Sequence, residues 1–310
     1  MLSNSAFLAA GTGIDYITAY HSLDRETKAE VHELFERAMV ITNQNITPTE
    51  NTFNDNLADQ IRNYCLNCAI SNAFFRLGIT PRYIAGYSMG LYSALYTGRS
   101  IDFTAGVSLI SKAFHLLDIH TEHLKGNQGA MGVIIGLSAV EVNELLQSNP
   151  DAQVEIANVN NQYSVVISGL EIGVGQILRQ AAETGALHTN RIKVSFPYHT
   201  KYLTEVTQDF ASFLSGFPIK DLEYPLISTV DQSIITAAPQ IKKELALNLS
   251  SNISWQNTIL KMAELGITYF IEQSPGNSLE KIGKYLKVNC QFLNHQKVMA
   301  MVEKAGYSNA

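Results

Sequence analysis

The fold is most constrained by residues 83–97, where a short apolar run meets a glycine-flanked serine and then a helical pattern. The serine lies in Gly86-Tyr87-Ser88-Met89-Gly90, a Gly-x-Ser-x-Gly motif between a predicted strand and a predicted helix. This arrangement is typical of a nucleophile elbow, a turn so sharp that side chains two residues from the serine would collide. We therefore predict an α/β fold that holds Ser88 at the end of a sheet, beside the positive end of a helix. The alternative is an ordinary strand-to-helix turn that happens to contain a serine.

The composition excludes several classes of protein. The 310 residues are 46% hydrophobic and 16% charged, which suits a large core, and the length allows one large domain with a smaller insertion. The net charge of −6 argues against nucleic-acid binding. No apolar run reaches the ~18 residues of a membrane span, and the first residues lack the features of a signal peptide. With three cysteines, which suit a reducing compartment, a cytoplasmic protein is expected.

Strand and helix patterns alternate on both sides of the motif. An apolar strand beginning at Phe7 runs into the loop Gly11-Thr12-Gly13. Helices are predicted over 22–38, 56–77, 102–117, 203–214, 241–249, 255–264 and 278–286, and further strands over 225–228 and 267–272. This alternation indicates an α/β-hydrolase-like domain built from residues 1–126 and 196–310.

Residues 127–195 have a different organisation. Strands are predicted over 129–137, 154–158, 164–168 and 188–194, with a turn at 158–162 and helices over 138–147 and 170–184. Ser138 and Glu141 form a capping-box pattern at the start of the first helix. The order β-α-β-β-α-β is that of a ferredoxin-like unit, so we expect a small subdomain inserted into the larger one.

Two other groups of residues could in principle form a redox site or a metal site, but the sequence supports neither well. Cys65 and Cys68 have redox-motif spacing, but they lie on an apolar helical stripe, which favours core packing. His115, His120 and His123 could suggest a metal, yet no fixed ligand geometry supports one, and a solvated helix end is the simpler interpretation. We predict no metal and no bound cofactor.

Taken together, the ordered motifs resemble the malonyl-CoA:acyl carrier protein transacylase family and the acyltransferase domains of polyketide and fatty acid synthases. The match covers nearly the whole chain. The motifs that carry it are Gly11–Gly13, the elbow 86–94, Ser100-Ile101-Asp102-Phe103, Gly129-Ala130-Met131 with Ile135-Gly136-Leu137, Asn158-x-Asn160 with 165–169, Pro197-Tyr198-His199-Thr200, Trp255, and Glu272-x-x-Pro275-Gly276.

The resemblance implies a catalytic Ser–His pair. Ser88 would be the nucleophile and His199 the base that takes its proton, because a serine hydroxyl attacks poorly without one. The main-chain carbonyl of Asn248 would orient the histidine. The amides of Met89 and Thr12 would form the oxyanion hole, although the family usually has glutamine at position 12.

One departure from the family concerns the acyl group. Family members that load malonyl groups carry an arginine 25 residues after the serine, where this chain has Ala113. Without that arginine, burying the malonyl carboxylate in the pocket would weaken binding by roughly 2–5 kcal/mol. Ala113 and Phe114 would make that end of the pocket apolar, and Tyr87 and Tyr198 would contribute to its wall. We therefore expect an acyl group without a free carboxylate.

These inferences leave several functions open. We expect a discrete editing acyl hydrolase that takes an uncharged acyl group from a carrier-protein or CoA thioester and releases it to water. The alternatives are a transferase that passes the group to a carrier-protein thiol, with malonyl as its substrate if the Ala113 argument fails, and a non-catalytic scaffold. The expected partner is an acyl carrier protein bearing phosphopantetheine. Lys281, Lys284 and Lys287 are a candidate docking patch, although an ordinary solvated face explains them at least as simply.

Overall fold

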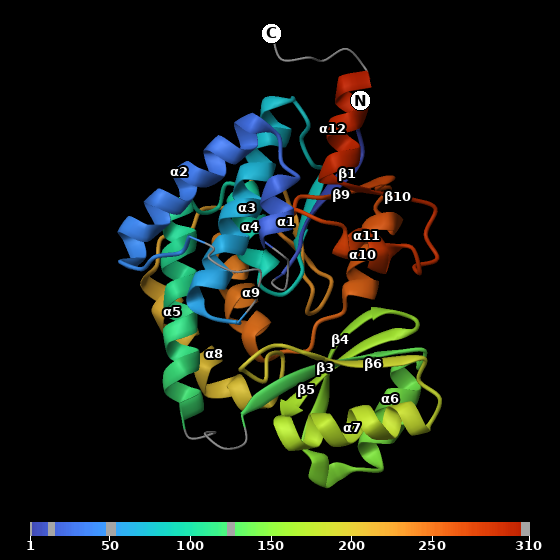
Figure 1. Ribbon diagram of the computed structural model, residues 1–310. Coiled ribbons are helices and arrows are strands. Elements are labelled where there is room, and N and C mark those ends of the chain that lie inside the picture. Colours follow the sequence, from blue (N-terminus) through green and yellow to red (C-terminus); the bar gives the residue numbers. More distant parts are fainter. Residues whose placement is uncertain (1, 12–15, 48–53, 123–127, 305–310) are drawn as a thin grey trace.

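The computed structural model describes residues 2–11, 16–47, 54–122 and 128–304, which form two sheets with helices packed around them (Figure 1). The larger sheet has the order β10-β9-β1-β2-β7-β8 and is parallel except for the β7–β8 pair. Its strands are β1 (Ser5–Ala9), β2 (Tyr83–Gly86), β7 (Leu226–Ile227), β8 (Ile234–Ile235), β9 (Tyr269–Glu272) and β10 (Gln291–Asn294).

Alternating side chains of the central strands enter two separate cores. Phe7 of β1 joins the core formed with α1 to α5, α8, α9 and α12, whereas its neighbour Leu8 packs against α10 and α11 on the opposite face. The strands are hence apolar on both faces, as buried parallel strands are. The helices are α1 (Tyr16–His21), α2 (Arg25–Thr42), α3 (Leu57–Arg76), α4 (Gly90–Thr97), α5 (Phe103–Thr121), α8 (Thr204–Gly216), α9 (Ala238–Ser250), α10 (Trp255–Glu264), α11 (Ser278–Gly283) and α12 (His295–Lys304).

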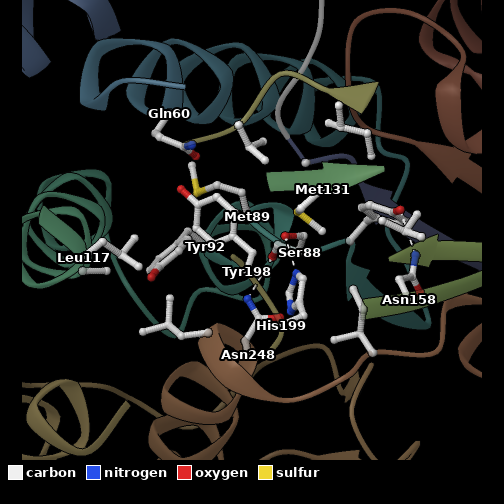
Figure 2. A pocket seen from close by; sticks show the side chains of 18 of the residues that line it. Gln60, Ser88, Met89, Tyr92, Leu117, Met131, Asn158, Tyr198, His199 and Asn248 are labelled. Carbon is white, nitrogen blue, oxygen red and sulfur yellow. Dashed lines mark hydrogen bonds between the residues drawn. The ribbon is translucent and has the colours of Figure 1, made fainter. Parts of the chain in front are cut away.

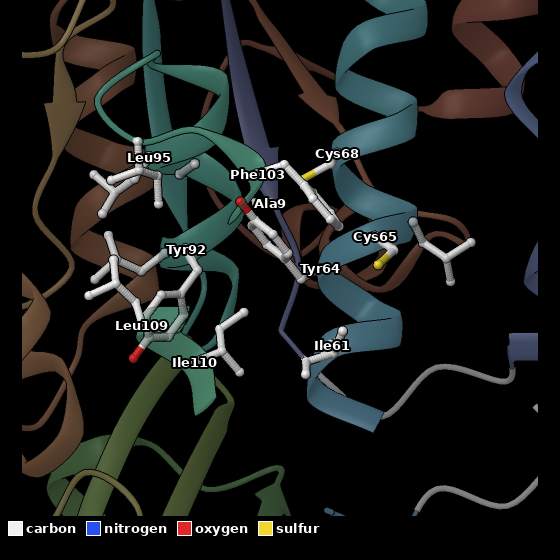
Figure 3. Close-up of a cluster of buried hydrophobic side chains, with 14 of the residues drawn as sticks. Ala9, Ile61, Tyr64, Cys65, Cys68, Tyr92, Leu95, Phe103, Leu109 and Ile110 are labelled. Atoms are coloured by element: carbon white, nitrogen blue, oxygen red, sulfur yellow. The ribbon is translucent and has the colours of Figure 1, made fainter. Parts of the chain in front are cut away.

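Helix α3 is buried over most of its circumference. Figure 3 shows Tyr64, Cys65 and Cys68 of this helix in the same core as Phe103. Both cysteines are free and have no exposed surface, and burial raises the pKa of each thiol. The prediction that they pack in the core is confirmed.

The smaller sheet is antiparallel, with the order β4-β5-β3-β6. It consists of β3 (Gly129–Ile135), β4 (Val154–Asn161), β5 (Ser164–Leu170) and β6 (His188–Ile192). Helices α6 (Ala139–Gln147) and α7 (Glu171–Glu183) cover its outer face, away from the larger sheet (Figure 1). The capping box at Ser138 and Glu141 is present. The predicted α/β fold with a ferredoxin-like subdomain is confirmed, while its boundaries at 126/127 and 195/196 stay a prediction.

Several local predictions need correction. The predicted turn at 158–162 is wrong, since β4 continues through Asn161. Asn158 and Asn160 resemble turn residues, but tertiary hydrogen bonds satisfy their side chains within the strand. The predictions also missed α1, β8 and β10, whose short segments carry little periodicity, and α12, which is longer and has apolar residues at helical spacing. No helix in the described ranges is long and apolar enough to cross a membrane.

Candidate active site

The motif at residues 86–90 forms the sharp turn between β2 and α4. Ser88 has a left-handed backbone with φ of 53°, a conformation uncommon for residues other than glycine. A Cβ on Gly86 would overlap the backbone of Leu91, and one on Gly90 would overlap the carbonyl oxygen of Ala9. Both glycines are therefore required by close backbone approach, and the predicted elbow geometry is present.

The Ser88 hydroxyl faces the imidazole of His199, with Oγ and Nε2 2.9 Å apart (Figure 2). His199 lies in the segment between β6 and the 3₁₀ turn Lys201–Leu203. Its own φ is 61°, and its backbone N–H donates to the carbonyl of Leu249 over 2.8 Å. Two residues 111 positions apart are thus brought into hydrogen-bond contact by the tertiary fold.

Burial controls the protonation of this histidine. The His199 side chain is almost fully enclosed, and desolvation lowers its pKa to about 4, against the smaller opposing effect of nearby backbone carbonyls of Ser251 and Asn248. The imidazole is therefore neutral at physiological pH and is free to accept a proton from Ser88.

The contacts of Asn248 differ in detail from the expectation. The backbone carbonyl of Asn248 lies near the imidazole of His199 and raises its pKa slightly. His199 Nδ1 nevertheless has no hydrogen-bond partner among the described residues. The Asn248 side chain instead donates from Nδ2 to the carbonyl of Ser88 over 3.2 Å. Asn248 thereby contacts both the histidine and the elbow, and its predicted orienting role stays a prediction.

Only one of the two predicted oxyanion-hole residues can be located. Met89 precedes the first residue of α4, at the positive end of that helix. Thr12 lies outside the described residues. The neighbouring Gly11 lines the same cavity as Ser88.

A cavity of about 220 Å³ opens at the Ser–His pair. All four predicted pocket residues line it: Ala113 and Phe114 from α5, Tyr87 from the elbow and Tyr198 beside His199. No Lys, Arg, Asp or Glu belongs to its lining within the described part of the chain. The sequence reasoning missed further lining residues, which come from the small sheet and the segment after it, from α3 to α5, from α9 and from the segment after α9: Gln60, Tyr92, Ile110, Leu117, Met131, Asn158, Val166, Ile192, Val194, Leu249 and Ile253. Gln60 shares one face of α3 with the buried residues Asn63 and Asn67, and this polar row was the local signal that the sequence offered.

A hydrogen-bond network joins the elbow to the small sheet. Tyr87 Oη donates to Oδ1 of Asn160 and accepts from Nδ2 of Asn158, each over 2.8 Å. The Tyr87 ring packs edge-on against Trp255, whose backbone N–H donates to Asn158. Tyr87 is consequently a structural link as well as part of the pocket wall.

The histidine cluster has a different environment from a metal site. His120 contacts Asp209 through Nε2 over 2.8 Å and Glu205 through Nδ1 over 3.4 Å. His123 lies outside the described residues. Across the described ranges, no group of three His, Cys, Asp or Glu side chains is arranged to hold a metal ion.

Comparison with known proteins identifies the family of this chain. No family model matches the chain. The Malonyl CoA-acyl carrier protein transacylase of Bacillus subtilis is 31% identical over 71% of this chain and 69% of its own length. The Synechocystis protein of the same name is 26% identical over 94% of this chain and 92% of its own length.

Solved structures agree with these relatives. FabD from Acinetobacter baumannii superposes with a TM-score of 0.85 at 25% identity, covering 99% of this chain and 98% of its own. A malonyl-transacylase in complex with a type II polyketide synthase acyl-carrier protein gives a TM-score of 0.85 at 24% identity, covering 97% of this chain and all of its own.

The two-sheet fold and the serine elbow facing a buried histidine define a serine acyltransferase that acts on thioesters. Within that class, the chain belongs to the family of malonyl CoA-acyl carrier protein transacylases.

Proposed function

We propose that this protein transfers an uncharged acyl group from a CoA or carrier-protein thioester, through Ser88, to the phosphopantetheine thiol of an acyl carrier protein. The observation that carries the choice of acyl group is the uncharged, largely apolar cavity with Ala113 in its wall. The relatives' names describe transfer to a carrier protein, which supports a thiol acceptor over the release to water expected from the sequence. Those names specify malonyl, whereas the uncharged pocket of this chain favours a different group.

The Ser–His geometry suits a two-step transfer. Ser88 Oγ attacks the thioester carbonyl while His199 Nε2 accepts its proton, and the amide of Met89 stabilises the developing oxyanion. Collapse of the tetrahedral intermediate breaks the carbon–sulfur bond, and the protonated His199 returns its proton to the leaving thiolate. In the second step His199 deprotonates the incoming thiol, which attacks the acyl-Ser88 ester and displaces the serine oxygen, to which His199 returns the proton.

The test is intact-protein mass spectrometry of carrier proteins. Carriers loaded with acetyl, butyryl or malonyl groups are incubated with the protein and with a second, unloaded carrier. We expect acetyl or butyryl to move to the second carrier and malonyl to move poorly. The Ser88→Ala variant should transfer none of the three groups. Release of free acid without transfer would instead identify the hydrolase, and acyl transfer by Ser88→Ala would contradict the assigned nucleophile.

A gain-of-function variant tests the acyl preference separately. Ala113→Arg places a guanidinium in the cavity wall, where it can pair with a carboxylate. We expect malonyl transfer to rise by about 10-fold or more relative to acetyl, measured by the same assay. Ala113→Met is the matched control, since it adds length without charge. Efficient malonyl transfer by the unaltered protein would contradict the argument from Ala113.

A further inference from the structure

The cavity wall contains a buried hydrogen-bond acceptor that has no partner among the described residues. Gln60 of α3 is 5% exposed and lines the cavity, and Figure 2 shows its side chain directed toward Met89. Its Oε1 atom makes no hydrogen bond to any residue in the described part of the chain. A buried acceptor left unpaired is unfavourable, so this oxygen is a place where a ligand group can gain affinity.

Asp55 sets the orientation of the Gln60 side-chain amide. Gln60 Nε2 donates to Asp55 Oδ1 over 2.8 Å. The other carboxylate oxygen accepts the backbone N–H of Ser195 over 2.8 Å, and the Tyr198 hydroxyl lies 3.4 Å from Oδ1. An ionised carboxylate only accepts hydrogen bonds, so the amide must turn its NH₂ group toward Asp55 and its oxygen away from it.

We propose that Asp55 and Gln60 make the acyl cavity selective for chains that carry a neutral hydrogen-bond donor, such as a hydroxyl group. A hydroxyl donates to Gln60 Oε1, whereas an unsubstituted chain leaves this oxygen unpaired and a keto or carboxylate oxygen opposes it. Tyr92 also lines the cavity, but its hydroxyl can both donate and accept and so sets no preference. Asn248 Oδ1 is a second buried acceptor of the cavity without a partner among the described residues, and it does not contact Asp55, so substitution of Asp55 isolates the contribution of Gln60. The inference rests on the proposed acyl transfer and narrows its substrate class.

The isosteric variant Asp55→Asn provides a sharp test, because it should reverse the polarity of this site. The Ser195 N–H is a fixed backbone donor, so the oxygen of the introduced amide must face it and the NH₂ group of that amide must face Gln60. The Gln60 amide then has to flip, which turns its own NH₂ group toward the cavity. The variant should consequently prefer a chain with an acceptor and no donor.

Assay conditions must keep Asp55 ionised in the unaltered protein. Burial raises the pKa of Asp55 to about 7, opposed by its hydrogen bonds from Ser195, Gln60 and Tyr198 and reinforced by Asp59. Asp59 is itself paired with Arg62 over 2.7 Å, and Tyr16 is the other titratable side chain facing this group. Measurements at pH 8 therefore report the ionised state.

The experiment compares CoA thioesters in two matched series at pH 8. These are butyryl, 3-hydroxybutyryl and 3-oxobutyryl, and hexanoyl, 5-hydroxyhexanoyl and 5-oxohexanoyl, with kcat/KM measured for transfer to a carrier protein. In at least one series we expect the hydroxyl form to exceed the other two by about 10-fold in the unaltered protein. Asp55→Asn should favour the oxo form, and Gln60→Met should lose the hydroxyl preference.

Distinct outcomes overturn the two proposals. Equal kcat/KM within both series, or ratios that Asp55→Asn leaves unchanged while its melting temperature shows a folded protein, would overturn this inference alone. Absence of transfer from every thioester by the unaltered protein would overturn the proposed function on which it rests.

Discussion

At the scale of single residues, the candidate catalytic pair is held by strained backbone. Ser88 and His199 both have positive φ, of 53° and 61°. Such conformations cost about 1–3 kcal/mol each and persist only where the surrounding structure enforces them. Here the Tyr87 N–H donates to Ala9 over 2.9 Å and the His199 N–H donates to Leu249 over 2.8 Å. The backbone therefore orients the two side chains before any substrate binds.

The protonation of His199 leads to a prediction about pH. Because burial lowers its pKa to about 4, the imidazole is already the free base at pH 5. For an unsubstituted acyl group such as acetyl, which makes no hydrogen bond to Gln60, we expect kcat/KM for transfer to stay constant between pH 8 and pH 5 and to fall about tenfold per unit below pH 4. Circular dichroism over the same range is the control for folding. A decline centred near pH 6.5, the ordinary value for histidine, would contradict the prediction.

At the scale of elements, the contact between α4 and β1 depends on the absence of a side chain. Helix α4 begins at Gly90, directly beside the carbonyl oxygen of Ala9 at the end of β1. Ser88 can lie at the end of the sheet only because helix and strand approach this closely. The elbow is therefore a packing constraint between two elements as well as a local turn.

Substitution of Gly90 tests that constraint. Gly90→Ala would force a Cβ into the Ala9 carbonyl, so we expect a loss of about 1–3 kcal/mol in the free energy of unfolding, measured with urea. Gly175→Ala is the matched control, because this glycine lies within α7 and an added Cβ would meet only the flexible end of Arg179 at 3.7 Å. The control should gain about 0.5–1 kcal/mol. Equal stability of the two variants would argue against a close helix–strand contact.

At the scale of the whole molecule, the active-site cavity lies where the two sheets meet. The elbow supplies Ser88 from the large sheet, while Met131 and Val166 line the cavity from the small sheet. Backbone hydrogen bonds also cross this junction, from Ile253 to Ala157 over 2.9 Å and from Val159 to Ile253 over 3.3 Å. A change in the small sheet should consequently alter the cavity without touching the Ser–His pair.

The Tyr87 hydroxyl adds side-chain hydrogen bonds to the contacts between the elbow and the small sheet. Tyr87→Phe removes its hydrogen bonds to Asn158 and Asn160 and leaves buried amide groups less satisfied. We expect a loss of about 1–3 kcal/mol in the free energy of unfolding, with faster hydrogen exchange in β4. Tyr163→Phe should change neither quantity, since the Tyr163 side chain is half exposed. If the Tyr87→Phe variant showed the same hydrogen-exchange rates in β4 as the unaltered protein, the backbone contacts alone would be sufficient to hold the sheets together.

Features that depend on local spacing could be predicted from the sequence. The elbow glycines, the capping box at Ser138 and the β-α-β-β-α-β order are all set by residues a few positions apart, and each is present in the structure. Ser88 and His199 could be named because their motifs resemble those of a family. Of the segments that were missed or misassigned, α1, β8, β10 and the end of β4 are short and take their conformation from neighbours distant in the chain. Helix α12 has a helical pattern of its own, which the sequence analysis overlooked.

The tertiary structure decided how these residues act together. The sequence alone determined an α/β chain with an elbow serine, an inserted ferredoxin-like subdomain and alanine in place of an arginine, since each is encoded in local pattern. The depressed pKa of His199 and the direction of the Gln60 amide arise from burial and from partners far away in sequence, as the Asp55–Ser195 hydrogen bond illustrates. Burial and long-range hydrogen bonding exist only once the chain has folded, so only the structure could reveal them.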